Sequence, residues 1–128
     1  MIRNRQGSGY IVMSIFTMGV DVGSTASKCV IIKDGKEIVA TAVVPVGTGT
    51  SGPARVMKQA LEQLGFTSME QLNGAIATGY GRNSLQEVPA QMSELSCHAK
   101  GAYFLFPRVR TIIDIGGQDS KALKIGDN

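Results

Sequence analysis

Length, composition and charge already exclude several classes of protein. The chain has 128 residues, of which 43% are hydrophobic and 18% charged, the size and composition of one ordinary globular domain and not of a disordered segment. The formal net charge is +3, but Arg3 and Arg5 belong to the first twelve residues, and without them 11 basic and 10 acidic residues balance to +1. The remaining basic residues form no stripe interleaved with aromatic side chains, so nucleic-acid binding is not predicted.

The sequence also lacks signals for a membrane, a disulfide or a cysteine metal site. No apolar run approaches the roughly 18 residues of a membrane-spanning helix, so we expect a cytoplasmic protein without membrane contact. Cys29 and Cys97 lack CxxC spacing and are expected to be reduced thiols. His98 follows Cys97 directly, but adjacent residues of a helix point in different directions, so a shared metal is not expected.

The first twelve residues are typical of a leader. Residues 1–12 are polar and contain glycine, their apolar part is too short for a signal peptide, and Met13 offers a second start. We therefore expect residues 1–12 to be a non-native or disordered leader and the first domain to span residues 13–108.

The most informative stretch is an apolar strand that ends in an acidic residue and a glycine turn. Residues 15–22 suit a buried strand, and Gly23 allows the chain to turn. Asp21 is the fixed anion of this stretch, and a carboxylate there can hold Mg²⁺ or its water shell. Hydroxyl and amide donors follow at Ser24, Thr25 and Ser27. The stretch therefore predicts half of a phosphate-binding site.

The same pattern returns near the end of the chain. Residues 111–115 form a second apolar strand, in which Asp114 is followed by Ile115, Gly116 and a polar turn. Two such turns can hold one polyphosphate from opposite sides. We expect this strand to begin a second domain, residues 109–128, with residues 120–125 returning as the other arm of a hairpin.

Two further strands follow the first phosphate turn. Residues 29–33 and 37–46 are rich in β-branched side chains, and Asp34-Gly35 between them is a two-residue hairpin signal. The first three strands are therefore expected to be antiparallel. The first is apolar on both faces, as a central strand is, and the third suits an edge.

A glycine-rich loop leads into the first predicted helix. Residues 53–64 carry apolar side chains at helical spacing, with proline at the start and Gly65 after the end. The loop 47–52 lacks the Gly-Lys-Ser/Thr of a P-loop, so we interpret it as a connecting loop that caps the helix.

A fourth strand and a second helix complete the pattern. Residues 74–78 form a short strand that runs into a flexible loop, where Arg82 is either a ligand-facing charge or a solvated loop residue. A helix is expected between Pro89 and Pro107, which places Glu94 one to two turns from its start.

This order of elements predicts the fold class. Three strands, a helix, a strand, a helix and two strands fit a ribonuclease-H-like α/β domain, a mixed sheet flanked by helices, followed by the first hairpin of a second such domain. In such a sheet the tips of the first and fourth strands lie near the same edge, where acidic residues and metal collect.

Five motifs in chain order point to a family. They are Gly-Val-Asp-Val-Gly-Ser-Thr-Ala-Ser-Lys28, Val-Gly-Thr-Gly-Thr-Ser-Gly-Pro-Ala-Arg55, Ala-Thr-Gly-Tyr-Gly-Arg-Asn-Ser84, Glu-Leu-Ser-Cys-His-Ala99 and Ile-Asp-Ile-Gly-Gly-Gln-Asp119. Together they resemble the activator ATPases of 2-hydroxyacyl-CoA dehydratases, kin to the benzoyl-CoA reductase ATPase subunits within the actin-like ATPase superfamily. The resemblance covers the chain from Met13 onward and corresponds to the N-terminal half of such a protein.

The resemblance implies a function and a set of site residues. It implies a homodimeric ATPase of anaerobic metabolism that uses ATP to drive low-potential electron transfer into a dehydratase component. Within it, Asp21 would orient Mg²⁺ through water, and Glu94 and Asp119 would place the attacking water. The implied cofactor-binding residues are Gly23, Ser24, Thr25, Ala26, Ser27 and Lys28 on the first turn and Asp114, Gly116, Gly117 and Gln118 on the second.

The resemblance also implies a 4Fe-4S cluster shared between two subunits. The family's cluster cysteines follow the second phosphate motif, so Cys29 and Cys97 do not match them. The cluster ligands and the adenosine-binding half are expected beyond the last residue of this chain. We therefore expect the 128 residues alone to hydrolyse ATP weakly or not at all.

Two other interpretations remain open from the residues. One is a fragment of a sugar-kinase-like phosphotransferase, which would use the same turns with a substrate hydroxyl in place of water. The other is a non-catalytic truncated fragment, in which the hydroxyl-rich turns only cap strands. Cysteines downstream of Asn128 would favour the activator, and a catalytic aspartate with a sugar-contacting loop would favour the kinase.

Overall fold

The structure is a computed structural model that describes residues 2–6, 9–116 and 120–126. The chain folds as two compact units, Met1–Gln91 and Met92–Asn128. The domain boundary that we expected after residue 108 stays a prediction. Among the helices of the described residues, none is long and apolar enough to cross a membrane.

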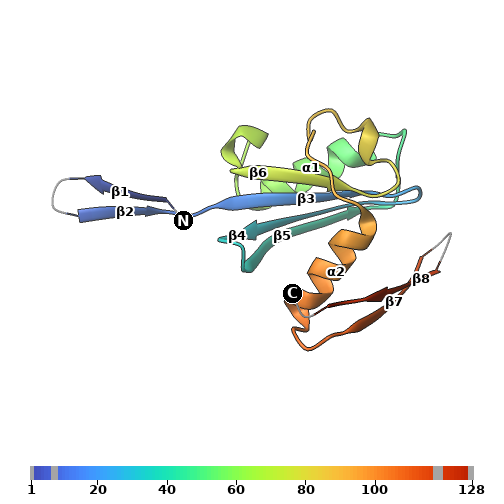
Figure 1. Cartoon of the computed structure of the whole chain (residues 1–128). Coiled ribbons are helices and arrows are strands. Elements are labelled where there is room, and N and C mark those ends of the chain that lie inside the picture. Colours follow the sequence, from blue (N-terminus) through green and yellow to red (C-terminus); the bar gives the residue numbers. More distant parts are fainter. Residues whose placement is uncertain (1, 7–8, 117–119, 127–128) are drawn as a thin grey trace. The chain divides into compact units, whose positions relative to one another are not determined.

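The first unit is built on a mixed four-stranded sheet with strand order β5-β4-β3-β6 (Figure 1). β3 is central, antiparallel to β4 and parallel to β6, and β5 is an edge strand antiparallel to β4. The sequence-based prediction of three antiparallel strands joined by a fourth is therefore confirmed. The strands are β3 Phe16–Val22, β4 Ser27–Lys33, β5 Glu37–Val44 and β6 Gly74–Thr78.

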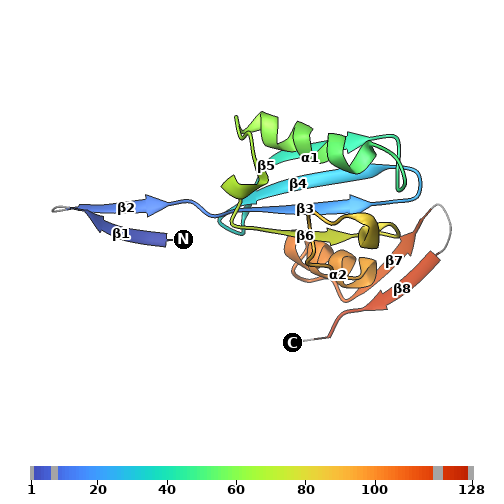
Figure 2. The same cartoon turned by 90° about the horizontal axis from the view of Figure 1, so that it is seen from above.

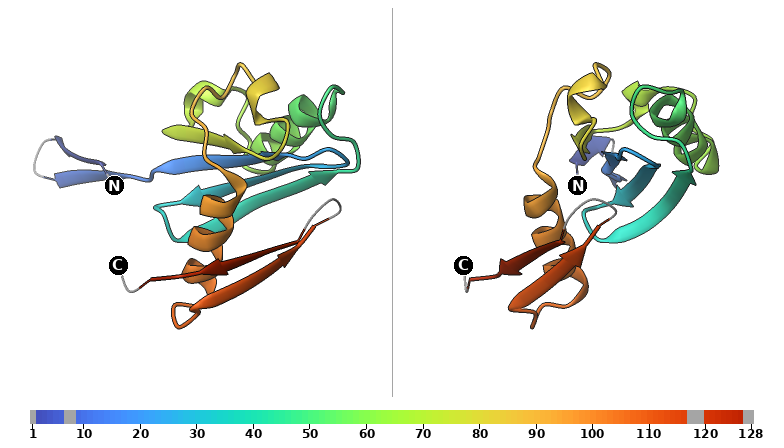
Figure 3. Two further views of the ribbon diagram at one scale, coloured as in Figure 1. Left: turned by 45° about the vertical axis from the view of Figure 1, so that its right-hand side comes forward. Right: turned by 90° about the vertical axis from the view of Figure 1, so that its right-hand side faces the viewer.

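Helix α1, Gly52–Gln63, covers one face of this sheet over β4 and β5 (Figures 2 and 3). Alternate strand residues point toward the helix, because successive side chains of a strand face opposite sides. Val20, Ile31 and Val44 from three neighbouring strands are almost fully buried, as are Val56 and Ala60 on α1. The other side chains of each strand, Asp21 among them, lie on the opposite face of the sheet.

Local signals in the sequence explain the connections of this unit. Asp34 and Gly35 both have positive φ, 55° and 69°, in the predicted hairpin turn between β4 and β5. Pro53 stands at the start of α1. The predicted capping box is present: Ser68 accepts from Glu70 N, and Gln71 accepts from Ser68 N. The short 3₁₀ turns are η1 Met69–Gln71 and η2 Arg82–Ser84.

The N-terminal segment forms a hairpin. β1 Ile2–Gln6 and β2 Gly9–Met13 pair antiparallel in a two-stranded sheet of their own. Strands were not predicted in this segment. Whether residues 1–12 belong to the native protein stays a prediction.

The second unit consists of one helix and one hairpin, α2 Glu94–Leu105 with β7 Thr111–Ile115 and β8 Ser120–Lys124. The prediction that this helix begins near Pro89 is wrong. Ala90 accepts from Ala77 N and Gln91 forms an isolated parallel bridge with Ala77, so the chain continues beside β6 before the helix starts. The Ser93 side chain caps the helix by accepting from Ser96 N. Glu94 is therefore the first helical residue.

Candidate functional site

Asp21 stands at the carboxyl end of the central strand, on the sheet face opposite α1. Its Oδ2 lies 3.3 Å from Nζ of Lys28, which is its partner in the antiparallel pair of β3 and β4. The two side chains are 31% and 51% exposed, so water screens the ion pair and its contribution to stability is small. A carboxylate in this position is open to a hydrated cation as well as to the lysine.

The turn after Asp21 is closed by its own backbone and held by a second loop. Gly23 N donates to Ala26 O at 3.0 Å, and Thr48 N donates to Gly23 O at 2.9 Å. A Cβ on Gly47 would lie 2.3 Å from Gly23 O, so only glycine allows the loop 47–52 to pack this closely. The loop that we interpreted as a connection therefore also supports the turn. Ser24 and Thr25 are exposed at its tip.

A third loop packs against the end of β3 from the side of β6. Gly81 N donates to Val22 O at 2.8 Å. Gly79 has φ +96°, and a Cβ there would lie 2.4 Å from Asp21 Oδ1 and 2.5 Å from Val22 O. The missing side chain thus makes room for the carboxylate, and the backbone conformation is one that L side chains rarely adopt. The place of this loop at a strand end was predicted, but its contact with Asp21 was not.

Ser27 faces away from the turn. Its side chain is fully buried and its hydroxyl donates to Val46 O at 2.9 Å. The hydroxyl therefore joins the start of β4 to the segment before α1. The assignment of Ser27 to a phosphate site rests on its backbone alone and stays a prediction.

Thr78 is a polar residue of this region that was not predicted from the sequence. It is the register partner of Asp21 across the parallel pair of β3 and β6, so both side chains lie on the same face of the sheet. Its Oγ1 is buried and has no hydrogen-bond partner among the described residues. An unsatisfied buried hydroxyl lowers stability by about 1–3 kcal/mol. A polar ligand bound beside Thr78 would supply the missing hydrogen bond. In the sequence, the signal that could have identified Thr78 was its position as the last residue of the strand.

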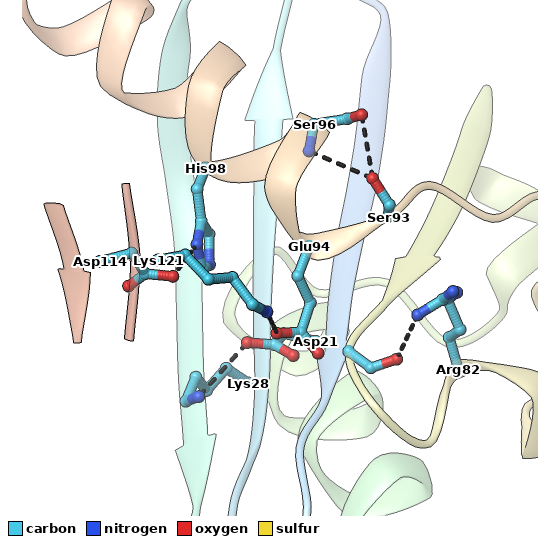
Figure 4. A network of polar contacts seen from close by, with 10 residues as sticks. Asp21, Lys28, Arg82, Ser93, Glu94, Ser96, His98, Asp114 and Lys121 are labelled. Atoms are coloured by element: carbon cyan, nitrogen blue, oxygen red, sulfur yellow. Dashed lines mark hydrogen bonds and ion pairs between the residues drawn. The ribbon is translucent and has the colours of Figure 1, made fainter. Parts of the chain in front are cut away.

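Arg82 folds back onto its own loop. Its Nη1 donates to Gly79 O at 3.0 Å, and the residue is half-buried. Of the two interpretations of this arginine, a ligand-facing charge and a solvated loop residue, neither describes this contact. The guanidinium holds the loop that approaches Asp21 (Figure 4).

The second unit brings four charged or titratable side chains together in two pairs (Figure 4). Asp114 Oδ2 on β7 lies 2.7 Å from His98 Nδ1 on α2. Glu94 Oε2, at the start of α2, lies 4.0 Å from Lys121 Nζ on β8. Both predicted carboxylates therefore have a cationic or imidazole partner that was not predicted from the sequence. In the sequence, the i,i+4 spacing of Glu94 and His98, which places them on one helix face, was the signal that could have identified His98 as part of the site.

Part of the second phosphate turn is not described. Gly116 follows β7 and is exposed. The other predicted residues of this turn, Gly117, Gln118 and Asp119, lie outside the described residues.

The donor set of the described residues fits magnesium better than iron. No group of three or more His, Cys, Asp or Glu residues is placed to share a metal within residues 2–6, 9–116 and 120–126. Mg²⁺ needs no such group, because it keeps several waters and is completed by phosphate oxygens around one or two carboxylates. Cys29 is buried in the core of the first unit, and this burial raises the pKa of its thiol to about 12, so it is a protonated core thiol.

Comparison with known proteins gives a consistent assignment. The chain is 60% identical over 114 residues to the (R)-2-hydroxyglutaryl-CoA dehydratase activating ATPase of Acidaminococcus fermentans, covering 88% of this chain and 44% of that protein. It is 56% identical over 113 residues to the activator of lactoyl-CoA dehydratase of Anaerotignum propionicum, with coverage of 88% and 43%. The chain thus spans less than half the length of these two relatives.

Solved structures agree in fold. The activator of 2-hydroxyisocaproyl-CoA dehydratase from Clostridium difficile with bound ADPNP superposes with a TM-score of 0.83 at 50% identity, covering 88% of this chain and 42% of that one. A protein from Chromobacterium violaceum, named a putative N-acetylglucosamine kinase, gives a TM-score of 0.54 at 12% identity, covering 84% of this chain and 44% of that one. The second likeness shows the fold alone, which confirms the predicted ribonuclease-H-like class.

The family follows from the extent of the match. Residues 18–128 match the BadF/BadG/BcrA/BcrD ATPase family, and this range contains both aspartate turns and all the elements between them. The chain belongs to the BadF/BadG/BcrA/BcrD ATPase family.

Proposed function

We propose that this chain supplies the phosphate-binding part of the nucleotide site in an ATP-hydrolysing activator of a 2-hydroxyacyl-CoA dehydratase. The observation that carries the proposal is the likeness to an activator solved with bound ADPNP. The geometry of the first turn supports it, because a partly exposed carboxylate, a lysine and a glycine turn meet at the end of one strand. The protein that contains this chain would be a cytoplasmic homodimer with a dehydratase component as its partner.

In this proposal the residues of the first unit hold the phosphates and the metal. Asp21 binds the water shell of Mg²⁺, and Lys28 beside it neutralises phosphate charge. Backbone amides and the hydroxyls of Ser24 and Thr25 contact the β- and γ-phosphates. Mg²⁺, when bound, neutralises the charge that develops on the phosphate oxygens. Positioning and charge neutralisation of this kind supply most of the catalysis in phosphoryl transfer.

The second unit contributes the other phosphate turn. Asp114 and the residues that follow it close on the phosphates, and Glu94 with Asp119 places the attacking water. The 4Fe-4S cluster does not fit the cysteines described in this chain, because Cys29 is buried in the core and Cys97 alone does not supply the four thiolates that such a cluster needs. Electron transfer to the dehydratase is therefore a property proposed for a longer protein, and no step of it is assigned to these residues.

Substitution of Asp21 tests the metal role in the complete natural protein. Asp21→Asn removes the charge but keeps the size of the side chain, and we expect Mg²⁺-dependent ATP hydrolysis to fall by about 10- to 100-fold. Asp34→Asn is the matched control. Asp34 has φ 55°, which asparagine tolerates, and its Oδ1 accepts from Ile15 N, a role that an amide oxygen also fills.

Unchanged hydrolysis in Asp21→Asn would contradict the metal assignment. Hydrolysis that depends on an added sugar would instead favour the phosphotransferase interpretation. The 128-residue chain alone is expected to turn over ATP weakly or not at all, and robust turnover by it would contradict the view that the adenosine-binding part lies elsewhere.

A further inference from the structure

Two side-chain pairs join helix α2 to hairpin β7–β8. Glu94 and His98 stand one helical turn apart, so their side chains lie on the same face of α2. Asp114 and Lys121 are directly opposite each other in the antiparallel register of the hairpin. His98 reaches Asp114 and Lys121 reaches Glu94 (Figure 4). The two carboxylates of the proposed site that the structure describes in this unit, Glu94 and Asp114, are thus each bound to the other element.

The two contacts differ in strength. The 4.0 Å pair of Lys121 and Glu94 is at the limit of an ion pair, and its side chains are 32% and 33% exposed, so it is weak. The contact of His98 with Asp114 is 2.7 Å, the length of a charge-assisted hydrogen bond. His98 is therefore the partner that fixes a carboxylate.

The contact also fixes the proton position on the imidazole. An ionised carboxylate only accepts hydrogen bonds, so the imidazole nitrogen that faces it must carry the proton. Nδ1 of His98 is consequently the donor to Asp114 Oδ2, whether the ring is neutral or charged. A hydrogen bond made by one ring nitrogen in this way sets the tautomer and the orientation of both partners.

Apolar packing does not perform this task in the second unit. No side chain described in residues 92–126 is buried, and the two residues that flank Asp114, Ile113 and Ile115, are 74% and 77% exposed. Ile113 and Ile115 point to the face opposite Asp114, since successive side chains of a strand alternate, but the Asp114 side chain is itself 29% exposed, so packing restricts its rotamers only weakly. The hydrogen bond from the helix is what restricts it.

We propose that His98 is a positioning residue that holds the carboxylate of Asp114 in the orientation required for nucleotide binding. The proposal rests on the proposed function, because it assigns a purpose to Asp114 in nucleotide binding. His98 itself contacts neither phosphate nor metal in this scheme. It acts through Asp114.

The tautomer can be read without reference to activity. His98 is the single histidine of the chain, so its imidazole ¹⁵N signals need no assignment. We expect long-range ¹H–¹⁵N spectra, recorded where the ring is neutral, to show a protonated Nδ1 and an unprotonated Nε2. In Asp114→Leu this preference should be lost. An Nε2-protonated ring in the unaltered chain would overturn the proposal.

Three substitutions at position 98 separate positioning from mere packing in the complete natural protein. Asn places an amide donor close to the position of Nδ1, Gln places it nearer to Nε2, and Ala removes it. We expect His98→Ala and His98→Gln to lower Mg²⁺-dependent ATP hydrolysis by about tenfold or more, because losing a positioning residue misplaces the group that it holds. His98→Asn should restore most of the activity. Lys100→Ala, an exposed position on the same helix, is the control.

The outcomes distinguish this proposal from the proposed function. If the unaltered protein neither binds nor hydrolyses Mg-ATP, the proposed function fails. If it is active and His98→Ala, His98→Gln and His98→Asn behave alike, the positioning role of His98 is overturned while the function stands. Thermal unfolding of each variant shows whether a loss of activity is a loss of fold, and the Asn rescue remains informative in either case.

Discussion

The two compact units each present an aspartate near the end of a strand, but different interactions stabilise the two units internally. In the first unit, Asp21 follows Val20 and precedes Val22, both buried against α1. In the second, Asp114 lies between Ile113 and Ile115, both largely exposed. The first turn is therefore attached to a close-packed core. The second depends on the strand ladder, on the hydrogen bond between His98 and Asp114 and on the weak ion pair of Glu94 with Lys121.

The difference has consequences for stability. Buried apolar surface contributes about 25 cal/mol per Å², whereas exposed ion pairs contribute at most about 1 kcal/mol each. A two-stranded hairpin alone is marginally stable in water. We therefore expect the first unit to carry most of the free energy of unfolding, and the second to open locally at a smaller free-energy cost.

The largest expected contrast comes from one substitution made in each unit. Ile31→Ala removes a side chain that is 0% exposed, and Ile113→Ala removes the same atoms from one that is 74% exposed. We expect the first to lower the free energy of unfolding by about 2–5 kcal/mol and the second to change it by less than about 0.5 kcal/mol. Urea unfolding followed by circular dichroism measures both. Equal effects would contradict the contrast between the units.

The next contrast uses pH. Burial raises the pKa of Cys29 from 9.0 to about 12, above its value in the unfolded chain, because the thiolate is disfavoured in the core. The protonated thiol contributes its full stability below about pH 9, and that contribution is lost as pH rises toward 12. The loss amounts to at most about 4 kcal/mol.

Paired variants isolate this pH effect from other titrating groups. Cys29→Ala should show a smaller decrease in the free energy of unfolding between about pH 9 and 12 than the unaltered chain. Cys97→Ala, in the second unit, should keep the decrease because Cys29 is still present. If unaltered chain and Cys29→Ala gave parallel pH curves, the burial of this thiol would not be energetically significant.

Substitutions of two glycines by alanine are expected to change the free energy of unfolding by smaller amounts and in opposite directions. Gly79→Ala forces a side chain onto a residue with φ +96° and against Asp21 Oδ1, and we expect a loss of about 1–3 kcal/mol. Gly101 lies within α2, and a Cβ there meets nothing within 4 Å, so Gly101→Ala should stabilise the helix by about 0.5–1 kcal/mol. Thermal unfolding measures both, and a destabilising Gly101→Ala would show that this surface is covered.

The smallest expected effect is local to α2. Ser93→Ala removes the hydroxyl that accepts from Ser96 N, at a cost of about 1 kcal/mol. Because no residue of this helix is buried among the described residues, we expect its amides to exchange with solvent about fivefold faster, while amides of β3 are unaffected. Hydrogen exchange resolved by residue is the measurement. Equal acceleration in β3 would mean that the two units unfold as one.

Much of the fold could be predicted because it depends on neighbouring residues. Strand alternation, the Asp34-Gly35 turn and the capping box of Ser68 and Gln71 all involve positions a few residues apart. The start of α2 was misjudged for a physical reason. Pro89 is a good first residue for a helix, but Ala90 pairs with Ala77 of β6 and keeps the chain extended there.

The candidate site likewise has some features that the local sequence predicts and others that it does not. The sequence predicts the residue types of the site, which are an aspartate followed by a glycine turn at the end of each of two strands. It does so because strand ends and turns have local sequence signatures. Four other features of the site could not be predicted from the local sequence. They are the hydrogen bond of Ser27 to Val46, the space that Gly79 leaves for Asp21, the unsatisfied hydroxyl of Thr78 and the hydrogen bond from His98 to Asp114. These features join residues distant in the sequence. Such contacts exist only when strands and helices have packed, since packing and register, and not local propensity, set which side chains meet.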